Sequence, residues 1–212
     1  MTVLQVGSIT LPLITAYDSI IQLNVQKGEK ILIHGAGGGV GFQAVQIAKQ
    51  LGLYIFATAS SSDKEVLLSA GVDQVIDYKT EQFEKVISPR GIDYCFDVVG
   101  GENLIKSISL CPKKLISVHY MEPDKMDKVG MKLHGILKWI IRLSMRKYDI
   151  HAKKNNVQLI GQVTAANAVL LQSLTEFVNK MSFMNRECPT RTLEDIELNG
   201  LNKLDLGKVI LF

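Results

Sequence analysis

The feature that most constrains this chain is a glycine-rich turn at residues 34–41, which read HGAGGGVG. An apolar run, Lys30–His34, precedes the turn, and an amphipathic stretch, Val40–Leu51, follows it. This order predicts a buried strand, a tight turn and then a helix. The glycines fit a variant of the GxGxxG pattern in which alanine stands first. Such small residues let a backbone turn tightly and approach a pyrophosphate group closely.

Short apolar runs continue to alternate with helical patterns along the rest of the chain. Further strands are expected at Leu53–Thr58, Gln74–Asp77, Ile92–Val99, Lys114–Val118, Val157–Val163 and Lys208–Phe212. Helices are expected at Leu13–Leu23, Asp63–Ala70, Glu81–Ile87, Asn103–Leu110, Leu133–Arg146 and Ala165–Met181. This alternation predicts an α/β fold, a doubly wound parallel sheet covered on both faces. In that context the turn is expected to bind a dinucleotide, the alternative being a turn that merely packs.

The residues at the end of the second expected strand indicate which dinucleotide binds. Sites for NAD place an acid there, about 20 residues past the start of the motif, to bind the ribose 2′-hydroxyl. Here the strand ends in hydroxyl residues, Ser60 and Ser61 among them, followed by Lys64. These donors favour a 2′-phosphate, and hence NADPH over NADH, although nearby Asp63 counts against it. Alternatively, a serine caps the next helix and Lys64 is a solvated surface residue.

Several stretches together resemble one known family. They are LPLITAYDSI, GEKILIHGAGGGVGFQAVQIAKQLG, IFATASS, AGVDQVIDY, GIDYCFDVVGG and the closing GKVILF. The chain resembles the medium-chain dehydrogenase/reductases, in particular their zinc-independent, zeta-crystallin-like quinone oxidoreductase branch. The resemblance is strong up to residue 110 and weak from residue 111 to residue 192. It implies a Rossmann domain that binds NADPH and transfers hydride to a quinone or an α,β-unsaturated carbonyl compound.

The resemblance also implies which residues contact the cofactor. Gly38, Gly39, Val40 and Gly41 would meet the pyrophosphate. Ser60, Lys64 and Tyr78 would surround the 2′-phosphate. Thr15, the turn Val98-Val99-Gly100 and the pair Val118-His119 would lie on the nicotinamide side. No catalytic residue is assigned, and His119 is expected to be polar lining rather than an acid.

The resemblance also implies a domain organisation. Residues 1–24 are a lead-in segment, 25–181 the Rossmann domain, and 182–212 a helix and strand that belong to a catalytic domain. Family members carry a GroES-like domain before the part that corresponds to residue 1, and the last strand, Gly207–Phe212, pairs with it. We therefore expect that strand to lack a partner, which makes it an association liability. The family's frequent dimerisation through the Rossmann domain implies a possible homodimer.

Composition narrows the remaining functions. Cys95, Cys111 and Cys188 are scattered, which argues against disulfides and structural zinc and favours a reducing compartment. The zinc-dependent relatives place a cysteine ligand near the position of Leu13–Tyr17, and this sequence has none there. The sequence shows no secretory signal and no apolar run of about 20 residues, so we expect a cytoplasmic protein. We also expect it to bind no metal and no nucleic acid.

Charge is concentrated in one segment. Residues 125–154 hold nine Lys and Arg against two acids, a net of +7, whereas the remaining chain has fifteen against nineteen, a net of −4. Within that segment, Leu133–Lys147 places apolar residues on one helical face and Lys138, Arg142 and Arg146 on the opposite face. Such a helix could lie on an anionic membrane. The alternative, which amphipathic helices adopt more often, is a helix packed on a protein core.

The sequence therefore favours an NADPH-dependent, zinc-independent reductase of small carbonyl or quinone substrates. One alternative is a nucleotide-binding or partner-binding module without turnover. Another is an enoyl-thioester reductase, whose glycine-rich turn is similar.

Overall fold

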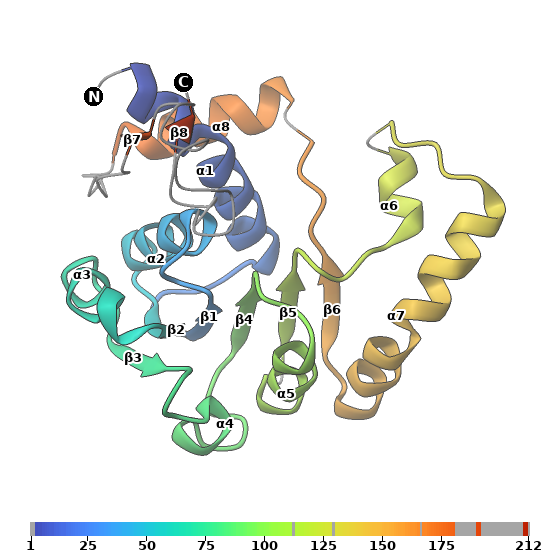
Figure 1. The fold of residues 1–212 in the computed structure, drawn as a ribbon, viewed down its shortest axis with the longest axis horizontal. Coiled ribbons are helices and arrows are strands. Elements are labelled where there is room, and N and C mark those ends of the chain that lie inside the picture. Colours follow the sequence, from blue (N-terminus) through green and yellow to red (C-terminus); the bar gives the residue numbers. More distant parts are fainter. Residues whose placement is uncertain are drawn as a thin grey trace.

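The computed structural model describes residues 3–111, 113–128, 130–165, 167–180, 190–191 and 210–211. Its centre is a six-stranded sheet in the order β3-β2-β1-β4-β5-β6, and all neighbouring strands run parallel. The strands are β1 (Lys30–His34), β2 (Tyr54–Ala59), β3 (Gln74–Asp77), β4 (Tyr94–Asp97), β5 (Lys114–Ser117) and β6 (Gln158–Gly161). The strand order reverses between β1 and β4, so the predicted doubly wound α/β fold is confirmed (Figure 1).

Helices cover both faces of this sheet. They are α1 (Val3–Leu23), α2 (Gly39–Gln50), the 3₁₀ turn η1 (Ser61–Asp63), α3 (Lys64–Ser69), α4 (Phe83–Val86), α5 (Glu102–Leu110), α6 (Pro123–Lys128), α7 (Gly135–Asn155) and α8 (Ala168–Val178). Side chains alternate across each strand. Ile31 and Ile33 pack with α1 and α2 on one face, whereas Leu32 packs with α5 and the far end of α7 on the other. Two separate apolar cores result, one on each side of the sheet.

Two helices are longer than predicted. α1 begins at Val3 rather than Leu13, with Pro12 inside it, where the proline contributes no backbone N–H. α7 continues past the predicted end at Arg146 as far as Asn155, and Asn156 stops it in the left-handed conformation at φ 57°. The other elements of the central sheet match their predicted positions within a few residues.

The closing strand differs from its expectation. β8 (Ile210–Leu211) pairs in parallel with β7 (Thr190–Arg191) in a small second sheet, so the prediction of an unpaired closing strand was wrong. No apolar pattern marks residues 190–191, which is why the sequence did not reveal the pairing. The helix predicted within residues 182–212 lies outside the described residues, and the proposed domain boundaries stay predictions.

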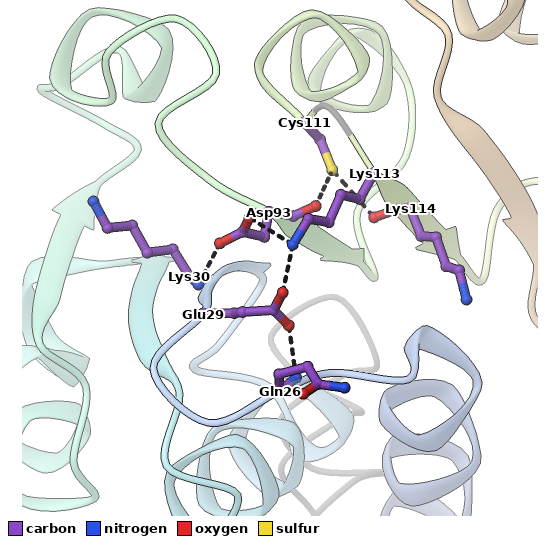
Figure 2. A network of polar contacts seen from close by, with 7 residues as sticks. All are labelled: Gln26, Glu29, Lys30, Asp93, Cys111, Lys113 and Lys114. Carbon is purple, nitrogen blue, oxygen red and sulfur yellow. Dashed lines mark hydrogen bonds and ion pairs between the residues drawn. The ribbon is translucent and has the colours of Figure 1, made fainter.

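A network of charges joins the loops at the amino ends of the central strands (Figure 2). The Lys113 ammonium pairs with the carboxylates of Glu29 and Asp93, the latter at 3.0 Å. Asp93 also accepts the backbone N–H of Lys30 at 2.9 Å, and Glu29 accepts that of Gln26 at 2.6 Å. Lys113 thus ties the start of β5 to the loops before β1 and β4.

Candidate cofactor site

The glycine-rich turn folds as predicted, and its glycines allow close backbone approach. Helix α2 begins at Gly39, directly after the turn. A Cβ atom on Gly41 would lie 2.8 Å from the Cα of Ala36, and one on Gly35 would lie 2.7 Å from the Val98 side chain. Only glycine therefore permits α2 to pack against the turn, and the turn against the segment after β4, at these distances.

The amino end of α2 presents backbone donors. Gly39, Val40 and Gly41 form the first helical turn, in which N–H groups have no acceptor within the helix. The N-cap residue is Gly38, which makes no side-chain hydrogen bond to these donors. The helix dipole adds roughly half a positive charge at this end. The predicted residues Gly38–Gly41 thus fit a pyrophosphate group.

A buried carboxylate, that of Asp97, holds the turn after β4. Its Oδ1 accepts the backbone N–H of Val99 at 3.0 Å and that of Gly100 at 2.9 Å. Its Oδ2 accepts the hydroxyl of Ser117, at the end of β5, at 2.7 Å. Asp97 therefore fixes the predicted turn and joins two strand ends. Asp97 was not among the predicted site residues, although an acid between an apolar strand and a turn is a recognisable signal.

Val118 and His119, which follow β5, lie beside the same turn. The Nε2 of His119 is 3.2 Å from the carbonyl oxygen of Val98, and a Cβ on Gly100 would lie 2.7 Å from the Cβ of His119. The backbone N–H of Val118 donates to the carbonyl of Asp97 at 3.1 Å. The loops after β1, β4 and β5 thus meet where the strand order reverses, the place at which such sheets bind ligands.

The expected 2′-phosphate region is joined to the glycine-rich turn by Asp63. The Ser60 hydroxyl donates to Asp63 Oδ2 at 2.8 Å and lies 2.7 Å from the Ser62 hydroxyl. Asp63 is buried, and a Cβ on Gly37 would lie 2.9 Å from its carboxyl carbon. The Asp63 carboxylate therefore packs between the loop after β2 and the glycine-rich turn.

Tyr78 and Lys64 flank this region from exposed positions. The Tyr78 backbone N–H donates to the carbonyl of Ala59, the residue before Ser60, at 3.2 Å. The Tyr78 side chain is exposed, with the Lys79 ammonium 6.0 Å from its ring centre. Ser61 opens η1, and Lys64 opens α3 with its side chain in solvent. These predicted residues share the carboxyl end of β2 and β3, although no contact joins Lys64 to Tyr78 among those described.

Thr15 lies at the carboxyl edge of the sheet near β6, away from the glycine-rich turn. Its Oγ1 is 3.4 Å from that of Thr164, which follows β6. Gln162, also after β6, donates to the Asp18 carboxylate of α1 at 2.7 Å and accepts from the Gln22 amide at 3.0 Å. These contacts hold α1 against the end of β6. They place Thr15 at the carboxyl edge of the sheet, but no contact in the described part of the chain joins it to the glycine-rich turn.

His34, directly before the glycine-rich turn, is a structural residue. Its Nδ1 lies 2.9 Å from the Thr58 hydroxyl and its Nε2 lies 2.7 Å from the Ser107 hydroxyl. Burial disfavours the imidazolium and lowers the pKa of His34 to about 4, against the opposing charge of Asp97. The neutral ring therefore joins β1 to β2 and α5.

Neither described cysteine is a reactive thiolate. Cys95 is fully buried in β4, and burial raises the pKa of its thiol. Burial also raises the pKa of Cys111 to about 12, and its Sγ lies 3.1 Å from the carbonyl of Lys114. Cys188 lies outside the described residues. Within the described ranges, no three His, Cys, Asp or Glu side chains form a group that could hold a metal ion.

Sequence comparison finds a matching family model and similar curated proteins. The family model for zinc-binding dehydrogenases matches residues 39–116. The human synaptic vesicle membrane protein VAT-1 homolog is 37% identical over 115 residues, which are 52% of this chain and 29% of that protein. Human quinone oxidoreductase is 35% identical over 112 residues, or 50% of this chain and 34% of the enzyme. The chain thus spans about a third of the length of these curated relatives.

A solved structure shares the fold. The quinone oxidoreductase of Thermus thermophilus, studied also in complex with NADPH, superposes with a TM-score of 0.67 and 19% identity. The match covers 93% of this chain and 61% of that enzyme. At this identity the likeness concerns the arrangement of strands and helices.

Proposed function

This chain belongs to the medium-chain dehydrogenase/reductase superfamily, and from that premise we propose that it binds NADPH and takes part in hydride transfer to a quinone or an α,β-unsaturated carbonyl compound. One observation carries the proposal: the loops after β1, β4 and β5 meet where the strand order reverses. The first of these loops is the glycine-rich turn, whose close backbone contacts leave no room for side chains.

The pyrophosphate would lie at the amino end of α2. The backbone N–H groups of Gly39, Val40 and Gly41 would donate to its oxygens, and the helix dipole would offset part of its charge. The absence of side chains at Gly38 and Gly39 leaves room for that approach.

Selection of NADPH over NADH would depend on the residues after β2. Ser60, Ser61 and Tyr78 offer hydroxyl groups, and the Lys64 ammonium adds a positive charge for a 2′-phosphate. The nearby Asp63 carboxylate is buried and already accepts a hydrogen bond from Ser60, so it does not face the solvent side where Lys64 lies. The charge that meets the phosphate is therefore that of Lys64.

The nicotinamide would lie against the turn Val98–Gly100, with Val118, His119 and Thr15 on the same edge of the sheet. Nicotinamide supplies the hydride when NADPH is bound. The protein would orient the ring through the turn fixed by Asp97, and the Val98, Val99 and Val118 side chains would exclude water from one side. The sequence has no cysteine in Leu13–Tyr17, so we place the activity in the zinc-independent branch.

Oxidation of NADPH, followed by its absorbance, tests the proposal directly. Quinones, short enones and enoyl-CoA esters should be offered separately, because an enoyl-thioester reductase would prefer the last. We expect turnover with quinones or enones and a slower rate with NADH. Absence of turnover with every acceptor, in a sample that binds NADPH, would leave a binding module and overturn the reductase assignment for this chain.

Lys64→Ala and Lys49→Ala form a matched pair for the cofactor preference. Both lysines are exposed, but Lys49 lies at the far end of α2. Loss of one charge-assisted contact should weaken NADPH binding about tenfold in Lys64→Ala and leave NADH binding unchanged. Equal weakening of both cofactors would contradict the role assigned to Lys64.

A further inference from the structure

Helix α7 presents a large apolar face to solvent. The exposed fractions are 77% for Ile136, 64% for Trp139, 53% for Leu143 and 55% for Ile150, and Ile140 beside them is half exposed. The sequence left two roles open for this helix, packing on a protein core, which is the more common one, and lying on an anionic membrane. Patches of large apolar side chains on a protein surface mark sites of interaction, so this face requires an explanation.

A different face of α7 packs on the domain. Ile141, Tyr148 and Ala152 are buried, and Met145 between them packs on the same core as α5 and β6. At 100° per residue these four positions form one stripe. The exposed apolar residues fall on the opposite side of the helix. The expected packing on the domain therefore exists, but it uses the second apolar stripe, and among the described residues nothing covers the first one.

The uncovered stripe also carries positive charge. α7 contains six Lys and Arg and a single acid, Asp149, whose carboxylate accepts the Tyr120 hydroxyl. Of the six cations, Lys138 and Arg142 pair with Asp127 and Asp124 of α6, beside the helix.

Three of the remaining cations belong to the exposed side. By the same helical geometry Arg146, Lys147 and Lys154 occupy positions on the same side as Trp139 and Leu143, and all three are exposed. The Lys147 ammonium lies 4.8 Å from the ring centre of Tyr148, at the border between the two sides. The exposed face thus combines large apolar groups with cations, and no acid of α7 lies on it.

We propose that this face of α7, residues 136–154, lies flat on an anionic lipid surface. Apolar side chains would enter the boundary between headgroups and acyl chains, and Trp139 would lie at the headgroup level. Arg146, Lys147 and Lys154 have aliphatic stems long enough to keep their charges among the phosphates. No described helix is long and apolar enough to cross a bilayer, so the contact is peripheral.

Charge favours a lipid surface over a second copy of the chain. A two-fold dimer through this face would bring the positively charged face of one α7 against that of the other, with no acid of α7 on either face to pair with the cations. An anionic bilayer supplies the opposite charge over its whole area. In Figure 1, α7 stands beyond β6, at the opposite end of the sheet from β3 and α3.

Trp139 is the sole tryptophan of the chain, so its fluorescence reports on this face alone. The full chain should be titrated with phosphatidylcholine vesicles and with vesicles that also contain phosphatidylglycerol, each at low and high salt. We expect the emission to move to shorter wavelength only with the anionic vesicles. The shift should weaken at high salt.

Two variants separate the apolar and charge contributions. Ile136→Ser with Leu143→Ser keeps the fluorescent reporter and should lower vesicle binding at least about tenfold. Its control is Val169→Ser with Leu171→Ser on α8, which are exposed residues elsewhere. Replacing Arg146, Lys147 and Lys154 by Gln should weaken binding about fivefold per cation, whereas the same change at exposed Lys27, Lys49 and Lys85 should have a small effect.

Three results would each overturn the proposal. One is the absence of a fluorescence change and of co-sedimentation with anionic vesicles at low salt. Another is an emission shift that rises with protein concentration without lipid, together with a dimer in sedimentation, which would assign the face to a second copy. The last is unchanged vesicle binding by Ile136→Ser with Leu143→Ser in a sample whose thermal unfolding matches that of the parent.

Discussion

The glycine-rich turn and the exposed side of α7 differ in how far contacts within the described chain explain their residues. Around the turn, buried polar groups such as His34 and Asp97 have partners within the fold, and glycines stand where a Cβ would clash. On α7, large apolar side chains stand in solvent beside cations. The turn is held in shape before any ligand arrives. The exposed apolar side chains of α7, in contrast, have no cover among the described residues, and the proposed lipid surface would account for them.

A glycine replacement in each region should show the contrast most strongly. Gly41→Ala places a Cβ 2.8 Å from the Cα of Ala36, whereas nothing lies within 4 Å of a Cβ on Gly135, the first residue of α7. We expect Gly41→Ala to lower the free energy of unfolding by about 3 kcal/mol or more, because backbone must move. Gly135→Ala should be neutral or slightly stabilising. Urea unfolding of both variants measures this, and equal effects would remove the distinction between the regions.

The buried His34 should make stability depend on pH. Its pKa of about 4 in the folded chain lies below the usual 6.5, so the unfolded chain binds the extra proton first as the pH falls. Its contribution is fully present above pH 6.5 and is lost towards pH 4, by up to about 3 kcal/mol. Urea unfolding between pH 7 and pH 4.5 should show this loss. His34→Gln should flatten this dependence of the unfolding free energy on pH. The control, His119→Gln, changes an exposed residue and should not flatten it. An unchanged slope in His34→Gln would contradict a buried neutral ring.

Adjacent isoleucines on α7 test which of its two stripes is packed. Ile141 is 9% exposed and Ile140 is 50% exposed. Ile141→Ala should therefore cost about 2 kcal/mol of unfolding free energy, because it empties a packed position, and Ile140→Ala well under about 1 kcal/mol. Thermal or urea unfolding compares them directly. A larger loss from Ile140→Ala would mean that α7 packs on its other face.

The charge network at the amino ends of the strands should give the smallest effect. Lys113 is partly exposed and pairs with Glu29 and Asp93, so Lys113→Met should cost under about 1 kcal/mol at neutral pH. Burial tends to raise the pKa of both carboxyls, but Lys113 and backbone N–H groups hold it below the usual value. That stabilisation is present above the usual carboxyl pKa and is lost as the pH falls below it. Lys113→Met should therefore flatten the acid end of the profile, and a steeper acid loss would contradict the pairing.

The sequence predicted the central sheet well because local signals there agree with the fold. Alternating apolar residues, the glycines and the strand–helix alternation all point to one structure, and the predicted residues at 38–41, 98–100 and 118–119 lie at one edge of it. The partners of those residues were harder to find. Asp97 also binds Ser117 on the neighbouring strand, and Asp63 packs against Gly37 in another loop, contacts that no local pattern encodes.

The α7 region shows where periodicity fails. The helix carries two apolar stripes, one around Ile136 and Leu143 and one around Ile141 and Tyr148. Hydrophobic pattern alone does not distinguish the stripe that meets the core from the one that remains exposed, because only the neighbouring elements decide it. The pairing of β8 with β7 was missed for a similar reason, since residues 190–191 carry no strand signal.

Thermal unfolding of the chain with increasing NADPH, beside NADH, tests the central claim most directly. A ligand that binds only the folded state stabilises it by about 2.7 kcal/mol at a hundred times its Kd. The account predicts a clear rise in Tm with NADPH, a smaller rise with NADH at the same concentration, and loss of that difference in Lys64→Ala. No rise with either cofactor in a folded sample would contradict a dinucleotide site at the glycine-rich turn.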